Sequence, residues 1–175
     1  MTPRVITIAD GVAEAQIVPG LGAGLASYDL LAAAERTALF RPCRDLSRAG
    51  PFDLANNLLV PWSNRISGGG FHFGGAFHRL DPNLPEEPYP IHGNGFSSRW
   101  SIERSASDSA ELSLRSEGPG PFRYEAHAAY AWRTARSACA FPSATSAQDR
   151  FRSASASTRG SSVLLKRGSR PRPRA

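Results

Sequence analysis

The sequence predicts an all-β protein, and three observations favour this class. Short segments rich in β-branched and aromatic residues recur along residues 1–131, and each is too short for a helix. Glycine and proline, 16 and 14 of the 175 residues, punctuate the chain between such segments. Within several segments apolar residues occupy every second position, as a strand with one buried face requires. An apolar content of 41% gives a chain of this length one domain with a real core.

Nine segments of the first 131 residues are predicted to be strands. In chain order they are residues 5–8, 13–18, 25–30, 37–41, 70–73, 76–80, 100–105, 111–115 and 123–131. The alternation of apolar and polar residues is clearest in the seventh and eighth segments. Gly74 and Gly75 join the fifth segment to the sixth and predict a two-residue hairpin turn. Residues 80–90 carry four prolines and should form a surface loop, whereas residues 30–35 could form a brief helical turn.

The charge of the chain is divided unevenly at Ala131. Residues 1–131 hold 11 arginines and 14 acidic residues, a net charge of −3. Residues 132–175 hold ten basic residues and one acidic residue, Asp149, a net charge of +9, and the two parts sum to +6. The basic character therefore belongs to the tail and says nothing about the partners of the body. We expect residues 1–131 to form the β-structured body and residues 132–175, rich in Arg, Ser and Ala, to be disordered.

Neither the basic tail nor the two cysteines are accompanied by a second feature that would indicate a binding partner. An arginine-rich tail can bind nucleic acid or an anionic membrane, yet its last thirty residues hold one aromatic residue, Phe151, and so no stacking platform. Cys43 and Cys139 lie too far apart to indicate a disulfide framework or a metal site. No apolar run has the length of a signal peptide or a membrane span. We expect a soluble, cytoplasmic protein that binds neither nucleic acid nor membrane.

The middle of the body carries the functional signal. Residues 57–69 read Asn-Leu-Leu-Val-Pro-Trp-Ser-Asn-Arg-Ile-Ser-Gly-Gly, and residues 90–96 read Pro-Ile-His-Gly-Asn-Gly-Phe. The glycine hairpin and the proline-rich loop lie between them. Asn-Arg followed at this spacing by His-Gly resembles the aldose 1-epimerase (galactose mutarotase-like) family, over most of residues 1–131. The resemblance implies part of a galactose mutarotase-like β super-sandwich, less than half of a complete family member.

The resemblance implies an isomerase of carbohydrate metabolism that interconverts the α and β anomers of a free aldose. Opening the hemiacetal takes a proton from the C1 hydroxyl and delivers one to the ring oxygen. Arg65 matches a substrate-binding residue whose planar donor fork suits sugar hydroxyls, and Asn64 is expected to shape the turn that aims it. His92 is the candidate catalytic residue, since the matching family histidine hydrogen-bonds the sugar near its ring oxygen. We expect a hexose substrate, no cofactor and no metal.

The family's proton-transferring groups are not encoded in the chain. In the family a glutamate near the C-terminus is the base, and a histidine in a His-Pro-Trp-Phe segment is the acid. The tail is either a native basic extension or the product of a reading-frame slip. Back-translated codons after Ala131, read from the third base, contain His-Pro-Trp-Phe across residues 157–161, which favours the slip. We therefore expect a truncated chain with little mutarotase activity; the alternatives are a non-catalytic carbohydrate-binding module using Arg65 and His92, or a basic-tailed nucleic-acid-binding protein.

Some polar and aromatic residues admit a functional interpretation that the sequence does not favour. His72 and His78 face each other across the predicted hairpin, but no third or fourth metal ligand is near. The glutamate pair at residues 86–87 lies in the proline-rich loop and should be solvated charge. Trp62 and Trp100 could stack on a sugar, but we expect them to pack in the core or an interface.

Overall fold

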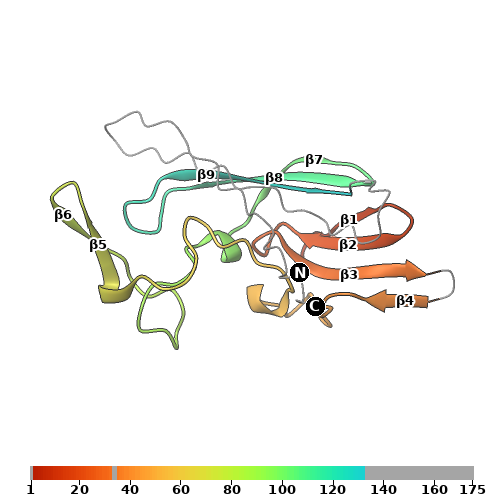
Figure 1. Cartoon of the computed structure of the whole chain (residues 1–175), viewed down its shortest axis with the longest axis horizontal. Coiled ribbons are helices and arrows are strands. Elements are labelled where there is room, and N and C mark those ends of the chain that lie inside the picture. Colours follow the sequence, from red (N-terminus) through yellow and green to blue (C-terminus); the bar gives the residue numbers. More distant parts are fainter. Residues whose placement is uncertain (1, 33–34, 133–175) are drawn as a thin grey trace, which may run out of the picture.

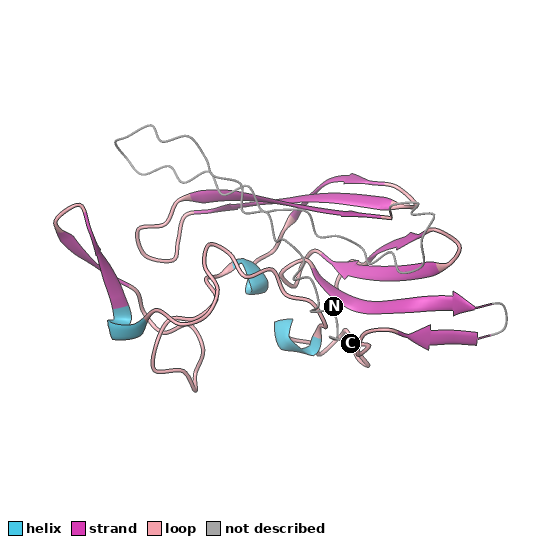
Figure 2. Ribbon diagram, in the orientation of Figure 1, coloured by secondary structure: helices cyan, strands magenta, loops and turns pink. Residues whose placement is uncertain are grey.

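The computed structural model describes residues 2–32 and 35–132 and confirms an all-β chain (Figure 2). Its described residues hold nine strands and three 3₁₀ helices, and each predicted strand overlaps one of the nine. The strands are β1 (Ile6–Ala9), β2 (Ala13–Val18), β3 (Gly24–Ala32), β4 (Glu35–Ala38), β5 (Gly70–Phe73), β6 (Ala76–Arg79), β7 (Ser101–Ser105), β8 (Ser109–Ser116) and β9 (Tyr124–Ala131). The 3₁₀ helices are η1 (Pro51–Asp53), η2 (Ser67–Gly69) and η3 (Gly95–Ser97). The predicted tail comprises residues 132–175. Its first residue, Trp132, packs against the core and its backbone N–H donates to the carbonyl oxygen of Asp108 at 3.1 Å, so the expected disorder is wrong for this residue. Residues 133–175 lie outside the described residues.

The first sheet holds β1 to β4 in sequential antiparallel order. The helical turn allowed over residues 30–35 is wrong, because β3 continues to Ala32 and β4 begins at Glu35 as its antiparallel partner. Backbone pairing of Leu30 with Thr37 and of Leu31 with Arg36 keeps this segment extended, and an ion-pair cluster lies on the same strands. The guanidinium of Arg36 lies 2.9 Å from the carboxylate of Glu14 on β2 and 3.1 Å from that of Asp29 on β3. Extended pairing thus places opposite charges together across three strands.

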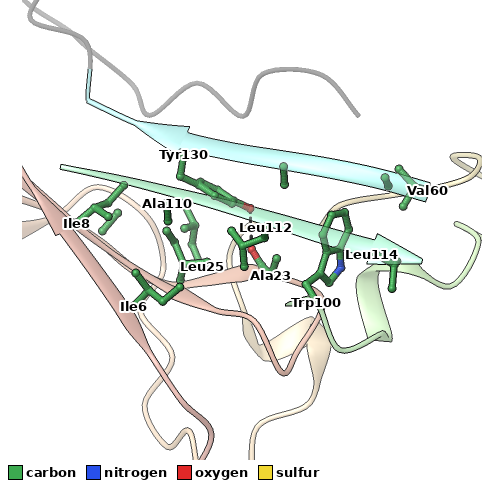
Figure 3. Close-up of a cluster of buried hydrophobic side chains, with 14 of the residues drawn as sticks. Ile6, Ile8, Ala23, Leu25, Val60, Trp100, Ala110, Leu112, Leu114 and Tyr130 are labelled. Carbon is green, nitrogen blue, oxygen red and sulfur yellow. Dashed lines mark hydrogen bonds between the residues drawn. The ribbon is translucent and has the colours of Figure 1, made fainter. Parts of the chain in front are cut away.

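The second sheet holds β7, β8 and β9, and its inner face packs on the first sheet (Figure 1). Buried residues alternate with more exposed ones along both β8 and β9, so one face of each strand enters the core. Figure 3 shows how side chains of the two sheets converge. The labelled core residues are Ile6, Ile8, Ala23, Leu25, Val60, Trp100, Ala110, Leu112, Leu114 and Tyr130.

Two polar groups enter this core with their hydrogen bonds satisfied. The hydroxyl of Tyr130 donates to the carbonyl oxygen of Ala23 at 2.6 Å, and burial raises the pKa of Tyr130 (Figure 3). The indole Nε1 of Trp100 donates to the carbonyl oxygen of Gly95 at 2.9 Å. Trp100 is buried and the half-buried Trp62 packs against Phe122, with ring centroids 5.2 Å apart. The expectation that both tryptophans pack against the core is confirmed.

The β5–β6 hairpin projects from the two sheets (Figure 1). Its two turn glycines have φ angles of 59° and 79°, both in the left-handed region that a two-residue turn favours. The predicted turn is therefore confirmed, but the placement of His72 opposite His78 is wrong. The register pairs His72 with Phe77 and Phe71 with His78, because a two-residue turn sets residues 73 and 76 opposite each other. No helix in the part of the chain that the structure describes could cross a membrane.

Candidate functional site

Two loops that are distant in the sequence run side by side and carry the predicted site residues. The first, residues 60–66, and the second, residues 90–95, join through an isolated antiparallel bridge between Arg65 and Ile91. The backbone N–H of Ile66 donates to the carbonyl oxygen of Pro90 at 3.0 Å, close to this bridge. Both loops lie between the β5–β6 hairpin and the two sheets (Figure 1). We call this pair of segments the two-loop unit.

One carbonyl group of the first loop accepts two hydrogen bonds from the second loop. The oxygen of Val60 accepts hydrogen bonds from the backbone N–H groups of Asn94 and Gly95, at 3.1 and 3.0 Å. Gly93 permits this close approach, because a Cβ atom on it would lie 2.1 Å from the Val60 oxygen. Its φ of 65° also favours glycine. The glycine after the histidine is thus required by the contact between the two loops.

Asn64 and His92 face each other across the two-loop unit and fix each other's orientation. Both have left-handed backbones, with φ of 66° and 62°. The backbone N–H of His92 donates to the carbonyl oxygen of Asn64 at 3.0 Å, and the N–H of Asn64 donates to Nδ1 of His92 at 2.8 Å. Because Nδ1 accepts a hydrogen bond, the neutral imidazole carries its proton on Nε2. His92 therefore presents a donor at Nε2.

Arg65 is held by a carboxylate from the proline-rich loop. Its Nε donates to Oε2 of Glu87 at 2.6 Å, and its Nη2 donates to Oε1 at 2.5 Å. The side chain of Arg65 is 48% exposed and that of Glu87 20% exposed. The hydrogen bond from Arg65 lowers the pKa of Glu87, aided by the charges of Arg65 and His92, and the same pair raises the pKa of Arg65.

The expectation that both loop glutamates are solvated charges is wrong for Glu87. The loop returns toward the first motif between residues 84 and 90, so Glu87 meets Arg65 although 22 residues separate them. Glu86 is exposed, as expected. The proline content predicted a loop but not its path, and only the path decides which of the two glutamates reaches the arginine.

Asn83 supports the second loop and was missed by the sequence analysis. Its Nδ2 donates to the carbonyl oxygens of Ile91 and Gly93, each at 2.8 Å. Its Oδ1 accepts the backbone N–H of Ile91 at 2.9 Å. One amide side chain thus makes three hydrogen bonds to the backbone on either side of His92. These contacts span eight and ten residues, so no local pattern in the sequence could have suggested this role.

Asn94 connects the second loop to the β7–β9 sheet. Its Nδ2 donates to Oγ of Ser116 at 2.9 Å, and the hydroxyl of Tyr124 donates to its Oδ1 at 2.5 Å. Ser116 ends β8 and Tyr124 begins β9. The loop that carries His92 is therefore fixed to the sheet on one side and to Asn83 on the other.

The unit presents hydrogen-bond donors and no metal-binding cluster. Glu87 occupies Nε–H and one N–H of Nη2 of Arg65, which leaves three guanidinium N–H groups, and His92 adds Nε2–H. Among residues 2–32 and 35–132, no group of three or more His, Cys, Asp or Glu side chains could hold a metal ion. Such an arrangement suits a ligand rich in neutral oxygen acceptors.

Comparison with known families and structures agrees with this geometry. A family model described as "Aldose 1-epimerase" matches residues 4–136 of the chain. A segment of 51 residues is 35% identical to the uncharacterised protein YphB of Escherichia coli K12, and covers 29% of this chain and 18% of that protein.

Two solved structures show the same fold at low sequence identity. One is from Escherichia coli K12 and described as a putative aldose 1-epimerase; it has a TM-score of 0.64 and 23% identity, with 73% of this chain and 41% of that chain covered. The other is a GalM/aldose epimerase homologue from Caenorhabditis elegans, with a TM-score of 0.55, 22% identity, and coverage of 74% and 41%. The chain thus spans less than half the length of either structure, and these likenesses show the fold alone.

Proposed function

The chain belongs to the aldose 1-epimerase family, and we propose that its two-loop unit is part of a binding site for a free hexose. The observation that carries this proposal is the placement of Arg65 and His92 on paired segments, where each side chain is oriented by its own partner and keeps unused N–H donors. Sugar hydroxyls and the ring oxygen are neutral acceptors, and they match this set of donors.

Each residue has a distinct role in the proposed site. The free edge of the Arg65 guanidinium donates to sugar hydroxyls. His92 donates through Nε2 to the ring region, where a donor favours opening of the hemiacetal between the two anomers. Asn64 acts through its neighbours: its N–H fixes the imidazole, and its Oδ1 accepts the N–H of Arg65 at 2.9 Å. The activity of the family, anomer interconversion by acid–base ring opening, requires in addition the family's acid and base.

We further propose that this polypeptide binds a hexose but opens its ring slowly. Within the described part of the chain, Glu87 is the one carboxylate that is ion-paired or hydrogen-bonded to Arg65 or His92. A carboxylate with two charge-assisted hydrogen bonds and a lowered pKa is a weak base. The molecule then behaves as a carbohydrate-binding module with low isomerase activity.

Calorimetric titration of the 175-residue chain with D-galactose tests the binding proposal. We expect measurable heat for the wild type and a loss of about tenfold or more in affinity for Arg65→Ala, because donors to the sugar disappear. Arg115→Ala is the matched control: its guanidinium is 81% exposed on β8, 3.9 Å from Glu125, and its loss should leave binding unchanged. Absence of heat with the wild type, or equal effects of the two substitutions, would refute the proposal.

Polarimetry tests the activity proposal separately. Freshly dissolved α-D-galactose should equilibrate in the presence of the purified chain at close to its uncatalysed rate. Rapid equilibration by the wild type, abolished in Arg65→Ala, would contradict the proposed slow turnover. It would mean that a group not in contact with Arg65 or His92 serves as the base.

A further inference from the structure

The carboxylate of Glu87 takes no part in the sugar contacts proposed above, yet it makes two short hydrogen bonds to Arg65 of the two-loop unit. Its distances of 2.5 and 2.6 Å to Arg65 compare with 2.8 Å between Asn64 and His92. Both oxygens are used, and the side chain is 20% exposed. Nothing in the resemblance or in the comparisons gives this residue a role.

The geometry of the pair decides which edge of Arg65 faces a ligand. A guanidinium is planar and carries five N–H groups in a rigid fork. Glu87 takes the edge formed by Nε–H and one N–H of Nη2. The three remaining N–H groups belong to Nη1 and to the outer side of Nη2. Glu87 therefore leaves one defined donor edge for the ligand.

Pairing with Glu87 neutralises most of the positive charge that Arg65 would otherwise present to a ligand. A solvent-accessible, unpaired arginine is a strong binder of phosphates and carboxylates. Paired through two hydrogen bonds, Arg65 and Glu87 have no net charge, and an approaching anion is repelled by the Glu87 carboxylate. Glu86, exposed in the neighbouring position, adds negative charge.

We propose that Glu87 is a positioning and specificity-determining residue, which orients the guanidinium of Arg65 and cancels its charge so that the site excludes anionic sugars. This inference rests on the proposed function, in which Arg65 binds a sugar. The inference adds Glu87, from the proline-rich loop, to the site. It explains discrimination between neutral and anionic sugars by electrostatic repulsion.

Calorimetry on the full chain with D-galactose and D-galactose 6-phosphate tests the inference. The wild type should bind D-galactose and bind the phosphate more weakly. Glu87→Gln removes the charge but keeps the length of the side chain, and should raise the affinity for the phosphate relative to D-galactose by about tenfold. Glu86→Gln makes the same change in net charge one residue away, and should shift this ratio far less. A loss of folding could not produce a gain of phosphate binding.

A second variant separates charge from position. Glu87→Asp keeps the charge and shortens the side chain, so it should weaken D-galactose binding while still excluding the phosphate. If Glu87→Asp and Glu87→Gln admit the phosphate equally, charge is not the cause and the inference is wrong. It is also wrong if Glu87→Gln and Glu86→Gln act alike, or if the wild type prefers the phosphate. Failure of the wild type to bind D-galactose would instead defeat the proposed function, and the inference with it.

Discussion

The two sheets and the two-loop unit are held together by different forces. The sheets bury an alternating set of apolar side chains, among them Ile8 and Leu112, each at most 1% exposed. The two-loop unit exposes most of its functional side chains and is held by hydrogen bonds, by left-handed backbone at Asn64 and His92, and by close contact at Gly93. Burial is non-directional and is shared among many close-packed side chains, whereas the unit depends on a few directional contacts. The two regions should therefore respond differently to substitution.

The largest effect on stability should come from the apolar core. Leu112→Ala removes a side chain that lies between the two sheets and should destabilise the protein by about 2–5 kcal/mol, because it leaves a cavity. Val12→Ala, at a position that is 60% exposed, should have little effect. Thermal unfolding followed by circular dichroism measures both, and similar melting temperatures for the two variants would contradict a core shared by the sheets.

Gly93→Ala should break the two-loop unit at its closest backbone contact. The added Cβ would lie 2.1 Å from the oxygen of Val60, and the residue has a φ of 65°. Gly11→Ala is the matched control, since Gly11 has a φ of 85° but no atom within 4 Å of an added Cβ. Both variants carry the backbone strain, so the clash should make Gly93→Ala less stable than Gly11→Ala by about 1–3 kcal/mol. Equal free energies of unfolding in urea would show that the loops are not packed this closely.

Tyr130→Phe should weaken the core without creating a large cavity. The change leaves the buried carbonyl oxygen of Ala23 without its 2.6 Å donor and should destabilise the fold by about 1–3 kcal/mol. Tyr89→Phe, at a side chain that is 38% exposed, serves as the control and should be near neutral. Chemical denaturation of both variants provides the comparison, and a neutral Tyr130→Phe would disprove the hydrogen bond.

The smallest predicted effect concerns the pH range of the Arg65–Glu87 pair. Since pairing lowers the pKa of Glu87 below the ordinary value of 4.5, the pair is fully formed above that pH and is lost only as the pH falls through the lowered value. Its contribution to stability is small because both groups reach solvent. A ¹³C NMR titration of the Glu87 carboxyl should give a midpoint below 4.5, and Arg65→Ala should move it upward. An unchanged midpoint in that variant would exclude the pair.

The sequence patterns predicted the sheets better than the two-loop unit. Alternation and turn glycines were sufficient to find all nine strands, because burial of one face is a local property of each strand. The continuation of β3 to Ala32 follows from its pairing with β4, whose register no local pattern reveals. Trp132 packs against the core, beyond the boundary predicted at Ala131, and the disorder of residues 133–175 stays a prediction.

The sequence identified the residues of the candidate site, but it did not predict the contacts that support them. Arg65 and His92 could be identified from a motif, and the structure pairs Arg65 with Ile91, the residue before His92. Asn83 and Glu87 act over eight or more residues along a loop whose path the prolines do not specify. The histidine register in the β5–β6 hairpin was predictable in principle, since the length of the turn fixes which residues pair.

The central claim is that His92 presents a donor at Nε2 beside the free edge of Arg65, and that a sugar binds there. Side-chain ¹⁵N NMR of the full chain, with and without D-galactose, tests it most directly. The account predicts the Nε2–H tautomer for neutral His92, and shifts of His92 Nε2 and the Nη groups of Arg65 on addition of D-galactose, while the backbone amide of Leu112 stays unchanged. An Nδ1–H tautomer, or resonances of His92 and Arg65 that D-galactose leaves in place, would contradict it.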